Sequence, residues 1–325
     1  MYDKTVSVVI PLFNKEQYIG RTLQSVVTQT MRSFEILVID DGSSDRGVDI
    51  VRDFKDARIR LIQQQNAGVS AARNRGISEA RSDLIAFLDA DDEWTPEFLE
   101  TIIKLQMKYP EAGIYAAAYN TVMPDGRILP TESKTAPSES CESIFFNYFK
   151  ATLQGKAAMH VSAVCIPARI FHELGGFLVG EKFGEDLEMF CRIAMRYPVA
   201  FSRNIGALYY LDAANSALNA HITVEDLPFV RTVRTAIENG IVDSEMTEDL
   251  QEYIAGCQLW NVKQNVLAGN RPTAKRMLRN CQPPRSRLRK LWWSFWASMP
   301  FTVTSFASQI NRDMKGIAKY IRSSR

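Results

Sequence analysis

The first hundred residues alternate short apolar runs with longer amphipathic segments. Apolar or β-branched runs cover residues 5–11, 34–40, 59–62 and 84–88, and helical spacing of apolar positions covers residues 17–30, 48–54 and 69–80. Strands that alternate with helices of this length imply crossover connections and a parallel sheet buried on both faces. Ligands of such sheets bind beyond the carboxyl ends of the strands. The residues directly after each strand are therefore the first candidates for chemistry.

The pattern becomes less regular after a helix expected from Pro96 to about Tyr109. Pro124-Asp125-Gly126 predicts a hairpin turn, and residues 131–143, rich in Ser, Thr, Glu and Pro, predict a mobile surface loop. The remaining predicted elements are a core strand at 161–166, an amphipathic helix at 185–195 and helical structure throughout 224–267, with caps offered by Thr223 and Thr247.

These patterns predict an α/β fold with three parts. A mostly parallel sheet flanked by helices is expected over residues 1–215. A helical C-terminal region follows at 216–280, and a basic, aromatic, amphipathic tail at 281–325.

Composition favours a cytoplasmic globular protein. Hydrophobic residues make up 46% of the chain and charged residues 23%, which is ordinary for a soluble domain. The five cysteines are odd in number and widely spread, which predicts reduced thiols. The apolar run at residues 6–10 is too short for a secretory signal and ends at Pro11, so no signal peptide is expected.

The charge is divided unevenly along the chain. Residues 271–325 contain thirteen Lys or Arg and one acid, Asp313, whereas residues 1–270 contain 26 basic and 36 acidic residues. Such a split indicates that the basic segment meets an anionic surface. Nucleic acid is not the expected partner, because no recognised binding module accompanies the charge.

The basic segment also carries aromatic and amphipathic patterns. Three of the five tryptophans (Trp292, Trp293, Trp296) follow the basic run 285–290, and apolar positions beyond Pro300 step by three or four. Residues 291–306 are too short and too rich in Ser and Thr to span a bilayer. We therefore expect peripheral contact of residues 285–325 with an anionic membrane at its inner face. The alternative is a helix packed on the protein's own body.

Acidic clusters stand where the strands should end. The first, Asp40-Asp41, opens a Gly- and Ser-rich stretch that also suits a tight turn and a helix N-cap, so by itself it does not discriminate. The second is Asp89-Ala90-Asp91-Asp92, and the third is Glu185-Asp186.

The second cluster points to a cation. Three carboxylates on one loop repel one another and raise each other's pKa values unless a positive charge is present. Oxygen ligands of this kind suit Mg²⁺ or Mn²⁺, which share the phosphates of a nucleotide diphosphate. Asp92 could instead cap the helix near Pro96, but capping requires one acid rather than three.

Five motifs together resemble family 2 glycosyltransferases of the GT-A fold, non-processive bacterial type. They are residues 6–14 (VSVVIPLFN), 40–45 (DDGSSD), 66–68 (NAG), 71–74 (AARN) and 88–92 (LDADD), in the expected order. The resemblance extends over roughly residues 5–215. It implies a nucleotide-sugar site at the carboxyl ends of the first strands.

The resemblance also implies a role for each motif residue. Pro11, Leu12 and Phe13 would line the base pocket, with Phe13 stacking on the base. Asp41 would read the pyrimidine edge, Asp40 would support that loop, and Arg73 would lie near the diphosphate. In the Asp89-Ala90-Asp91 motif, Asp89 would reach the ribose or the metal's waters, and Asp91 would bind Mn²⁺ or Mg²⁺ directly.

Glu185-Asp186 resembles the acidic pair of the same family, in which the aspartate is the general base. Asp186 would deprotonate the acceptor hydroxyl for a single displacement with inversion. An acidic pair at a helix N-terminus, favoured by the helix dipole, is the alternative interpretation.

The sequence departs from the family's pattern in two respects. The Gln-x-x-Arg-Trp signature of processive synthases is absent from the sequence, which favours transfer of one sugar per encounter. Many relatives have a histidine about two dozen residues after the acidic pair. In this chain Asp212 lies nearby and His221 follows later. We interpret His221 as an exposed loop histidine rather than as a metal or phosphate contact. We assign no role to His160 or His172.

Other functional classes fit less well. A dinucleotide-dependent oxidoreductase would need a glycine fingerprint after the first strand, where Pro11-Leu12-Phe13-Asn14 stands. A nuclease using Asp41, Asp91 and Asp186 would have to attract an acidic substrate to a net-negative body.

We therefore expect an inverting transferase that moves a sugar from a nucleoside-diphosphate sugar, UDP-linked, to an acceptor hydroxyl. The acceptor is expected to be a lipid-linked glycan of the cell envelope, as in surface-polysaccharide synthesis. A catalytically inactive nucleotide-sugar-binding or membrane scaffold protein is the alternative, and the presence of Asp91 and Asp186 speaks against it.

Overall fold

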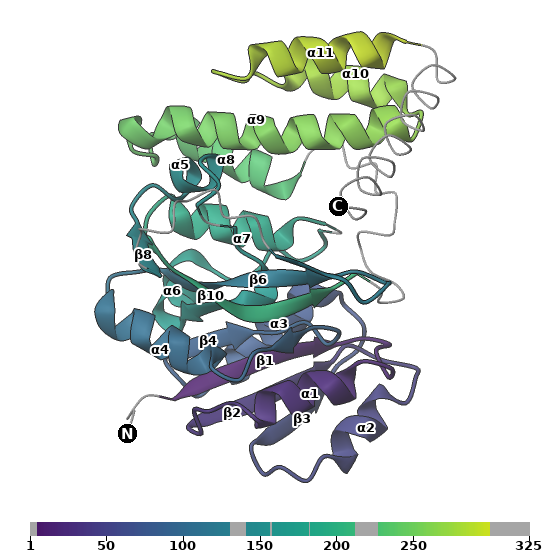
Figure 1. Cartoon of the computed structure of the whole chain (residues 1–325), viewed down its shortest axis with the longest axis vertical. Helices are drawn as coiled ribbons and strands as arrows, with labels where there is room; N and C mark the ends of the chain where they lie inside the picture. Colours follow the sequence, from purple (N-terminus) through teal and green to yellow (C-terminus); the bar gives the residue numbers. More distant parts are fainter. Residues whose placement is uncertain (1–4, 131–140, 157, 182, 212–226, 300–325) are drawn as a thin grey trace, which may run out of the picture. The chain divides into compact units, whose positions relative to one another are not determined.

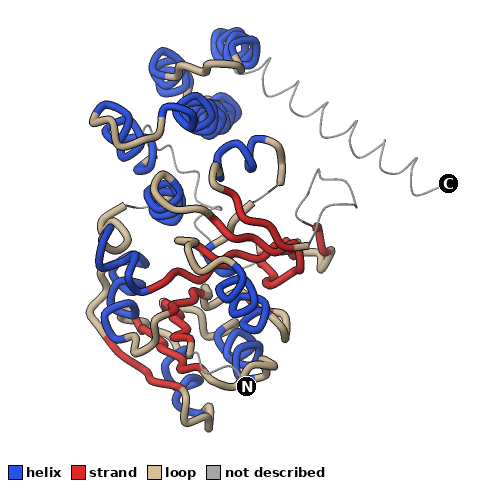
Figure 2. Tube along the Cα trace, turned by 90° about the vertical axis from the view of Figure 1, so that its left-hand side faces the viewer, coloured by secondary structure: helices blue, strands red, loops and turns tan. Residues whose placement is uncertain are grey.

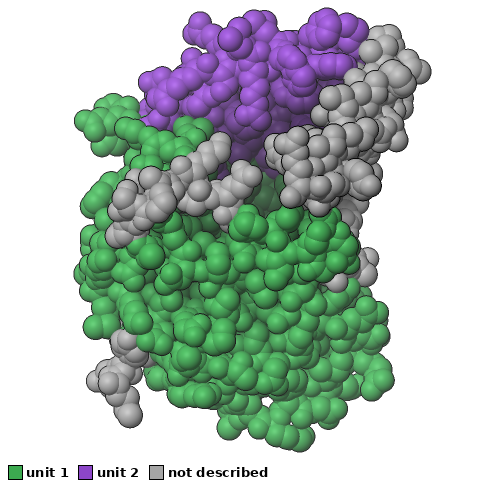
Figure 3. All heavy atoms as spheres, in the orientation of Figure 1, with its two compact units in different colours: residues 1–216, 228–246 green, residues 217–227, 247–325 purple. Residues whose placement is uncertain are grey.

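The computed structural model describes residues 5–130, 141–156, 158–181, 183–211 and 227–299. The chain divides into two compact units, unit 1 within residues 1–216 and 228–246 and unit 2 within residues 217–227 and 247–325 (Figure 3). Asp212, His221, most of the expected loop at 131–143 and the expected helix beyond Pro300 lie outside the described residues.

Unit 1 is built on one mixed sheet, with strand order β3-β2-β1-β4-β9-β6-β10-β5, β7 added to β6 and β8 added to β10 (Figure 1). The first four strands in this order are parallel, and the pairing of β6 with β10 is also parallel. The strands are β1 (Val6–Leu12), β2 (Phe34–Asp40), β3 (Ile59–Gln63), β4 (Leu84–Phe87), β5 (Glu93–Trp94), β6 (Ile114–Val122), β7 (Ile128–Pro130), β8 (Glu142–Phe145), β9 (Val164–Pro167) and β10 (Val199–Tyr210).

Helices cover both faces of this sheet (Figure 2). On one face, the alternate β1 residues Val6, Val8 and Ile10 share a core with α1 and α4. On the other face, Phe87 packs edge-on against Phe171 and Phe177. The helices of unit 1 are α1 (Ile19–Val27), α2 (Gly47–Asp53), α3 (Val69–Glu79), α4 (Phe98–Lys108), α5 (Tyr148–Leu153), α6 (Ala168–Leu174), α7 (Glu185–Ala194) and α8 (Pro228–Glu238).

Helix α3 approaches the sheet closely at a glycine. A Cβ atom added to Gly76 would lie 2.3 Å from Cγ1 of Val9 on β1. Glycine therefore permits the helix to lie directly on the strand, which places the first turn of α3 at the carboxyl end of the sheet.

Unit 2 contains α9 (Ser244–Leu267, whose first turn belongs to unit 1), α10 (Arg271–Asn280) and α11 (Arg287–Ser298). Leu259 of α9, Met277 of α10 and Trp293 of α11 belong to one apolar core. Arg285, just before α11, pairs with Asp249 of α9 at 2.8 Å. Within the described parts of the chain, no helix has the length and apolar character needed to cross a bilayer.

The alternation of strands and helices in the first hundred residues is confirmed, and so is the hairpin, in which Val122 pairs with Ile128 across a turn at Gly126. The described part of 224–267 is mostly helical, as expected, but Thr247 lies inside α9 and does not cap it. Helix α8 ends at Glu238, Gly240 adopts a φ of +66°, and α9 begins only at Ser244. A residue with positive φ terminates a right-handed helix, and glycine adopts it without strain.

Candidate functional site

Several strand ends of the parallel half of the sheet carry the predicted site residues. The loop after β1 contains Phe13, the loop after β2 begins with Asp41, and the loop after β4 contains residues 88–92. Because parallel strands bring their carboxyl ends to one edge, these loops are neighbours in unit 1.

The loop after β1 offers one exposed aromatic ring. Phe13 is 47% exposed, so its ring is accessible for stacking on a planar group. Leu12 is fully buried in the core, and its carbonyl oxygen accepts the amide of Asp41. The base-pocket roles predicted for Pro11, Leu12 and Phe13 stay predictions.

Asp40 and Asp41 are buried, and their carboxylates organise the surrounding loops. Asp40 accepts hydrogen bonds from the amide of Ser43 at 3.0 Å and from Gln63 Nε2 at 3.0 Å. Asp41 accepts from the amide of Gly68, at the start of α3, at 2.8 Å. The turn-forming interpretation therefore describes Asp40, and reading of a pyrimidine edge by Asp41 stays a prediction.

The amide of Ala67 at 3.0 Å and Gln64 Nε2 at 2.7 Å complete the partners of Asp41. This one carboxylate thus joins the end of β2 to the residues 64–68 that precede α3. Its loss would leave buried amide donors without an acceptor, which is costly.

Arg73 of α3 is the buried cation of the site. Its guanidinium donates to Asp89 Oδ1 at 2.8 Å and to Glu185 Oε1 at 2.8 Å, joining the loop after β4 to the start of α7. Burial opposes ionisation, but these carboxylates outweigh it and raise the pKa of Arg73. Arg73 Nε is buried and has no hydrogen-bond partner among the described residues.

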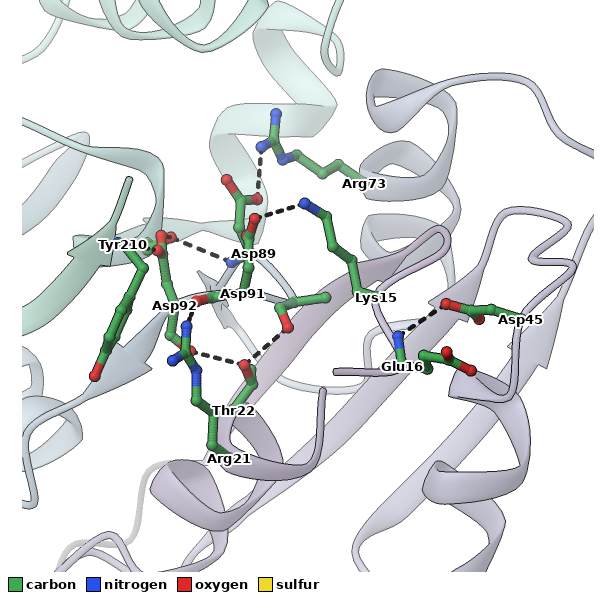
Figure 4. Close-up of polar contacts among 12 residues, drawn as sticks. Lys15, Glu16, Arg21, Thr22, Asp45, Arg73, Asp89, Asp91, Asp92 and Tyr210 are labelled. Atoms are coloured by element: carbon green, nitrogen blue, oxygen red, sulfur yellow. Dashed lines mark hydrogen bonds and ion pairs between the residues drawn. The ribbon is translucent and has the colours of Figure 1, made fainter. Parts of the chain in front are cut away.

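The backbone of the loop after β4 is held from α1. Thr22 Oγ1 donates to the carbonyl oxygens of Ala90 at 2.9 Å and Asp92 at 2.8 Å, and Arg21 donates to the carbonyl oxygen of Asp91 at 2.8 Å. Figure 4 shows these contacts converging on the acidic loop. Its carboxylates are therefore held in place before any ligand binds.

The three carboxylates of this loop have different partners. Asp89 pairs with Arg73, and Asp91 Oδ2 lies 2.7 Å from Nζ of Lys15. Asp92 is 1% exposed and accepts from Ser162 Oγ at 2.5 Å and from the amide of Tyr210 at 3.1 Å. Asp92 does not cap α4, which begins at Phe98 without a side-chain cap.

Negative charge in this loop is incompletely compensated. Burial and the neighbouring Asp89 raise the pKa of Asp91, and burial together with Asp89 and Asp91 raises the pKa of Asp92 well above its usual range. Burial acts on Asp89 too, but Arg73 outweighs it and lowers the pKa of Asp89. Such a cluster favours a cation.

The donor set of the loop fits Mn²⁺ or Mg²⁺ only with additional ligands. Among the residues that the structure describes, no group of three or more metal-binding side chains is present. Asp91 and Asp89 remain 17% and 28% exposed. One or two carboxylates suffice for a Mg²⁺-type ion that retains water and shares substrate phosphates, so the residues fit that ion.

Asp186 lies in the first turn of α7, after Gly184, which adopts a left-handed φ of +79°. Burial and the adjacent Glu185 raise the pKa of Asp186 to about 6, while Arg73 acts in the opposite direction. The first turn of α7 also carries Glu188, as the helix-dipole interpretation expects. The structure nevertheless places Asp186 within electrostatic reach of Arg73 and Asp89, both predicted site residues.

His160, to which the sequence assigned no role, lies beside the acidic loop. Its ring contacts the tilted rings of Tyr209 and Tyr119, with centroid distances of 4.3 Å and 5.2 Å. Its Nδ1 accepts from the amide of Ser162, so the 3.8 Å contact with Asp92 is not an ion pair. Burial lowers the pKa of His160 to about 4, which keeps the ring neutral at neutral pH.

Sequence reasoning also missed Lys15, Ser162 and Tyr210. Their contacts with the acidic loop span 76, 70 and 118 residues, so no local spacing signals them. His172 lies in the last turn of α6 and has no contact with the predicted site residues among the hydrogen bonds of the described chain.

The chain is similar to known proteins in sequence and in fold. The model of the family described as "Glycosyl transferase family 2" matches residues 7–171. "Putative glycosyltransferase EpsH" of Bacillus subtilis is 33% identical over 161 residues, 48% of this chain and 45% of that protein. The Escherichia coli "UDP-Glc:alpha-D-GlcNAc-diphosphoundecaprenol beta-1,3-glucosyltransferase WfgD" is 40% identical over 109 residues, 33% of this chain and 43% of that protein.

The matches to curated relatives span less than half of their length, between 16% and 45%. Among solved structures, Staphylococcus aureus TarS 1–349 in complex with UDP-GlcNAc superposes with a TM-score of 0.62 at 20% identity, over 78% of this chain and 71% of that chain. At this identity the likeness concerns the fold, and it confirms the expected GT-A-type architecture with a helical C-terminal region.

Proposed function

Because the chain belongs to glycosyl transferase family 2, we propose that it transfers a sugar from a UDP-linked donor to an acceptor hydroxyl with inversion at the anomeric carbon. The observation that carries this proposal is the meeting of α3, the loop after β4 and the start of α7 around Arg73. That residue pairs with Asp89 and, across 112 residues of sequence, with Glu185 beside Asp186. The site thus unites the predicted diphosphate, metal and base positions.

The nucleotide part of the proposal has separate support. The printed descriptions of WfgD and of the TarS complex name UDP-Glc and UDP-GlcNAc for those proteins. In this chain, the exposed Phe13 directly follows Leu12, whose carbonyl oxygen accepts the amide of Asp41. An aromatic ring next to a fixed carboxylate suits a pyrimidine base, which offers a flat face and a donor edge.

In the proposed reaction the acceptor oxygen bonds to the anomeric carbon while the bond from that carbon to the diphosphate oxygen breaks. The electron pair leaves on the diphosphate, and the hydroxyl proton passes to the carboxylate of Asp186. With a pKa raised to about 6, Asp186 is mostly ionised at neutral pH and more basic than an ordinary aspartate. Both properties suit a general base.

The remaining residues prepare the leaving-group side. Arg73 keeps Asp89 ionised and joins the loop that carries Asp89 and Asp91 to α3. Mn²⁺ or Mg²⁺, held by Asp91 and Asp89 together with diphosphate oxygens, would neutralise the charge of the leaving group. The helix α1 contacts to the backbone of residues 90–92 keep that loop rigid.

Thermal unfolding with UDP, GDP, CMP and NAD⁺, each with and without Mn²⁺, tests the donor site. We expect UDP with Mn²⁺ to raise the unfolding temperature, because a ligand that binds only the folded state stabilises it. Asp91→Ala should abolish the increase, whereas Asp53→Ala, an exposed carboxylate in the last turn of α2, should retain it. Absence of a response to every nucleotide would contradict the proposal and favour the inactive scaffold.

We extend the proposal to the acceptor and its location. A lipid-linked glycan of the cell envelope is the proposed acceptor, since the printed name of WfgD specifies a diphosphoundecaprenol-linked substrate for that protein. Residues 285–325 would hold the enzyme peripherally at the cytoplasmic face of an anionic membrane. The described part of this segment supports contact with lipid through α11, whose exposed face carries Leu288, Leu291, Trp292 and Phe295.

A further inference from the structure

The short loop between β1 and α1 is constrained on both sides of Lys15. Asn14 has a φ of +51°, the single positive value of a non-glycine residue in the described chain. Its side chain accepts the amide of Ser44 at 2.8 Å, and its own amide donates to Ser43 Oγ at 3.1 Å. A backbone conformation of this kind persists only where its surroundings enforce it.

The residue after Lys15 is fixed to the same neighbouring loop. The amide of Glu16 donates to Asp45 Oδ2 at 2.8 Å, and Glu16 Oε2 accepts the amide of Arg46 at 2.9 Å. Figure 4 shows the contact of Glu16 with Asp45 on one side and the side chain of Lys15 extending toward the acidic loop on the other. The backbone on both sides of Lys15 is therefore fixed to the loop after β2.

Lys15 ends on the carboxylate predicted to bind the metal. Its Nζ lies 2.7 Å from Asp91 Oδ2, and the two side chains are only 14% and 17% exposed. The backbone of Asp91 is fixed as well, because Arg21 donates to its carbonyl oxygen. Two fixed partners at low exposure interact more strongly than a surface ion pair, since salt and water screen them less.

We propose that Lys15 is the resident counter-ion of Asp91, and that Mn²⁺ or Mg²⁺ gains this carboxylate only when the ammonium moves to the diphosphate of a bound nucleotide. The second half of this inference rests on the proposed function. A metal alone must break the ion pair of Lys15 with Asp91. A nucleotide diphosphate offers the displaced ammonium a new anionic partner, so nucleotide and metal favour the same open arrangement and bind with positive coupling.

Titration of Mn²⁺ followed by the electron paramagnetic resonance signal of the free ion tests the inference without measuring catalysis. For the wild type, we expect UDP to tighten Mn²⁺ binding by about tenfold, a typical coupling between two ligands. Lys15→Met should bind Mn²⁺ alone about tenfold more tightly than the wild type and should lose most of the effect of UDP. Lys15→Arg keeps the charge and should bind Mn²⁺ alone as weakly as the wild type.

Lys104→Met is the matched control. It removes the same charge from an exposed lysine that pairs with Glu100 on α4, and it should leave Mn²⁺ affinity unchanged. Unfolding temperatures of all variants verify that they are folded, and Lys15→Gln replaces Lys15→Met if the latter is not.

The outcomes separate the inference from the proposed function. Unchanged or weaker binding of Mn²⁺ alone by the Lys15→Met variant would overturn the counter-ion role. Tighter binding by that variant, combined with no effect of UDP on Mn²⁺ binding by the wild type, would uphold the counter-ion role and overturn the coupling. The proposed UDP donor would then be judged separately, from thermal unfolding with UDP.

Discussion

At the scale of single residues, two carboxylates around Arg73 have opposite properties. Arg73 keeps the pKa of Asp89 below its usual range despite burial, whereas burial and Glu185 raise the pKa of Asp186 to about 6. Environments that separate the pKa values of neighbouring acids commonly divide charge stabilisation from proton transfer between them. In the proposed reaction, Asp89 would be the permanent anion and Asp186 would be the group that exchanges a proton.

This division predicts a pH dependence of turnover. Only ionised Asp186 can accept the acceptor's proton, so kcat/KM should rise with pH through an apparent pKa near 6 and then level off. Initial rates of sugar transfer across the acidic and neutral range measure this limb. A flat profile over that range would contradict the assignment.

The Asp186→Asn variant separates catalysis from binding. Turnover should fall by about 10²- to 10⁴-fold, the usual contribution of a general base, while stabilisation by UDP and Mn²⁺ persists. A wild-type protein that binds UDP but transfers no sugar would instead match the inactive nucleotide-sugar-binding alternative.

Apart from Arg73 and Asp186, which the family resemblance supplied, the site residues predicted from the sequence lie at or directly after the end of a strand. Asp89 and Asp91 could be predicted because β4 is a short apolar run that ends directly before them. Lys15 and His160 could not, because their proximity to the acidic loop depends on how distant strands are ordered in the sheet. The spacing of residues along the sequence does not indicate such contacts.

At the scale of elements, the contact of α3 with β1 sets the position of Arg73. Gly76 lies one turn of helix after Arg73 on the same face, directly against Val9. Any side chain there pushes α3 away from the sheet and moves Arg73 with it.

We therefore predict that Gly76→Ala destabilises the protein by about 1–3 kcal/mol, the usual cost of overpacking, although alanine is the better helix former. Gly20→Ala is the matched control on α1, because its added Cβ would lie 3.8 Å from Ile50, an ordinary contact. That variant should be neutral or slightly stabilising. Urea unfolding of both variants measures the difference, and equal stability of the two would contradict the close packing.

Elements of the second half of the sheet were harder to predict than those of the first. Strand β6 contains three consecutive alanines, Ala116–Ala118, which have low intrinsic preference for strands. It forms because it is enclosed between β9 and β10. The first four strands, in contrast, are rich in β-branched residues and are recognisable locally.

At the scale of the whole molecule, charge and exposed apolar surface coincide in the C-terminal part of the chain. Helices α10 and α11 carry seven Lys or Arg and no acidic residue. Helix α11 buries Trp293 and Ala297 yet also exposes Leu288, Leu291, Trp292 and Phe295, at the spacing of one helical face. One face of α11 packs on its own unit, as the alternative interpretation of this segment expects. The other face exposes apolar side chains, as the expectation of membrane contact requires.

We predict that the full-length protein binds vesicles containing anionic lipid more tightly than neutral vesicles, and that added salt weakens this binding. Trp292→Ala should weaken it by about tenfold, as expected for loss of a large, half-buried ring. Trp260→Ala removes a comparably exposed tryptophan from α9 and serves as the control. Co-sedimentation with vesicles gives the affinities, and equal loss in both variants would contradict a role for the exposed α11 face.

Part of the support of the acidic loop comes from residues that follow it in the chain. Asp92 receives its partners from Ser162 and Tyr210, and Arg73 receives Glu185. During synthesis the N-terminal part of a protein leaves the ribosome first. The α1 contacts to the acidic loop are therefore available long before Ser162 and Tyr210 emerge, and in a nascent chain that lacks β10 the carboxylate of Asp92 is still without the amide of Tyr210. Under the proposed function, the donor site is thus expected to be complete only after residue 210 has emerged.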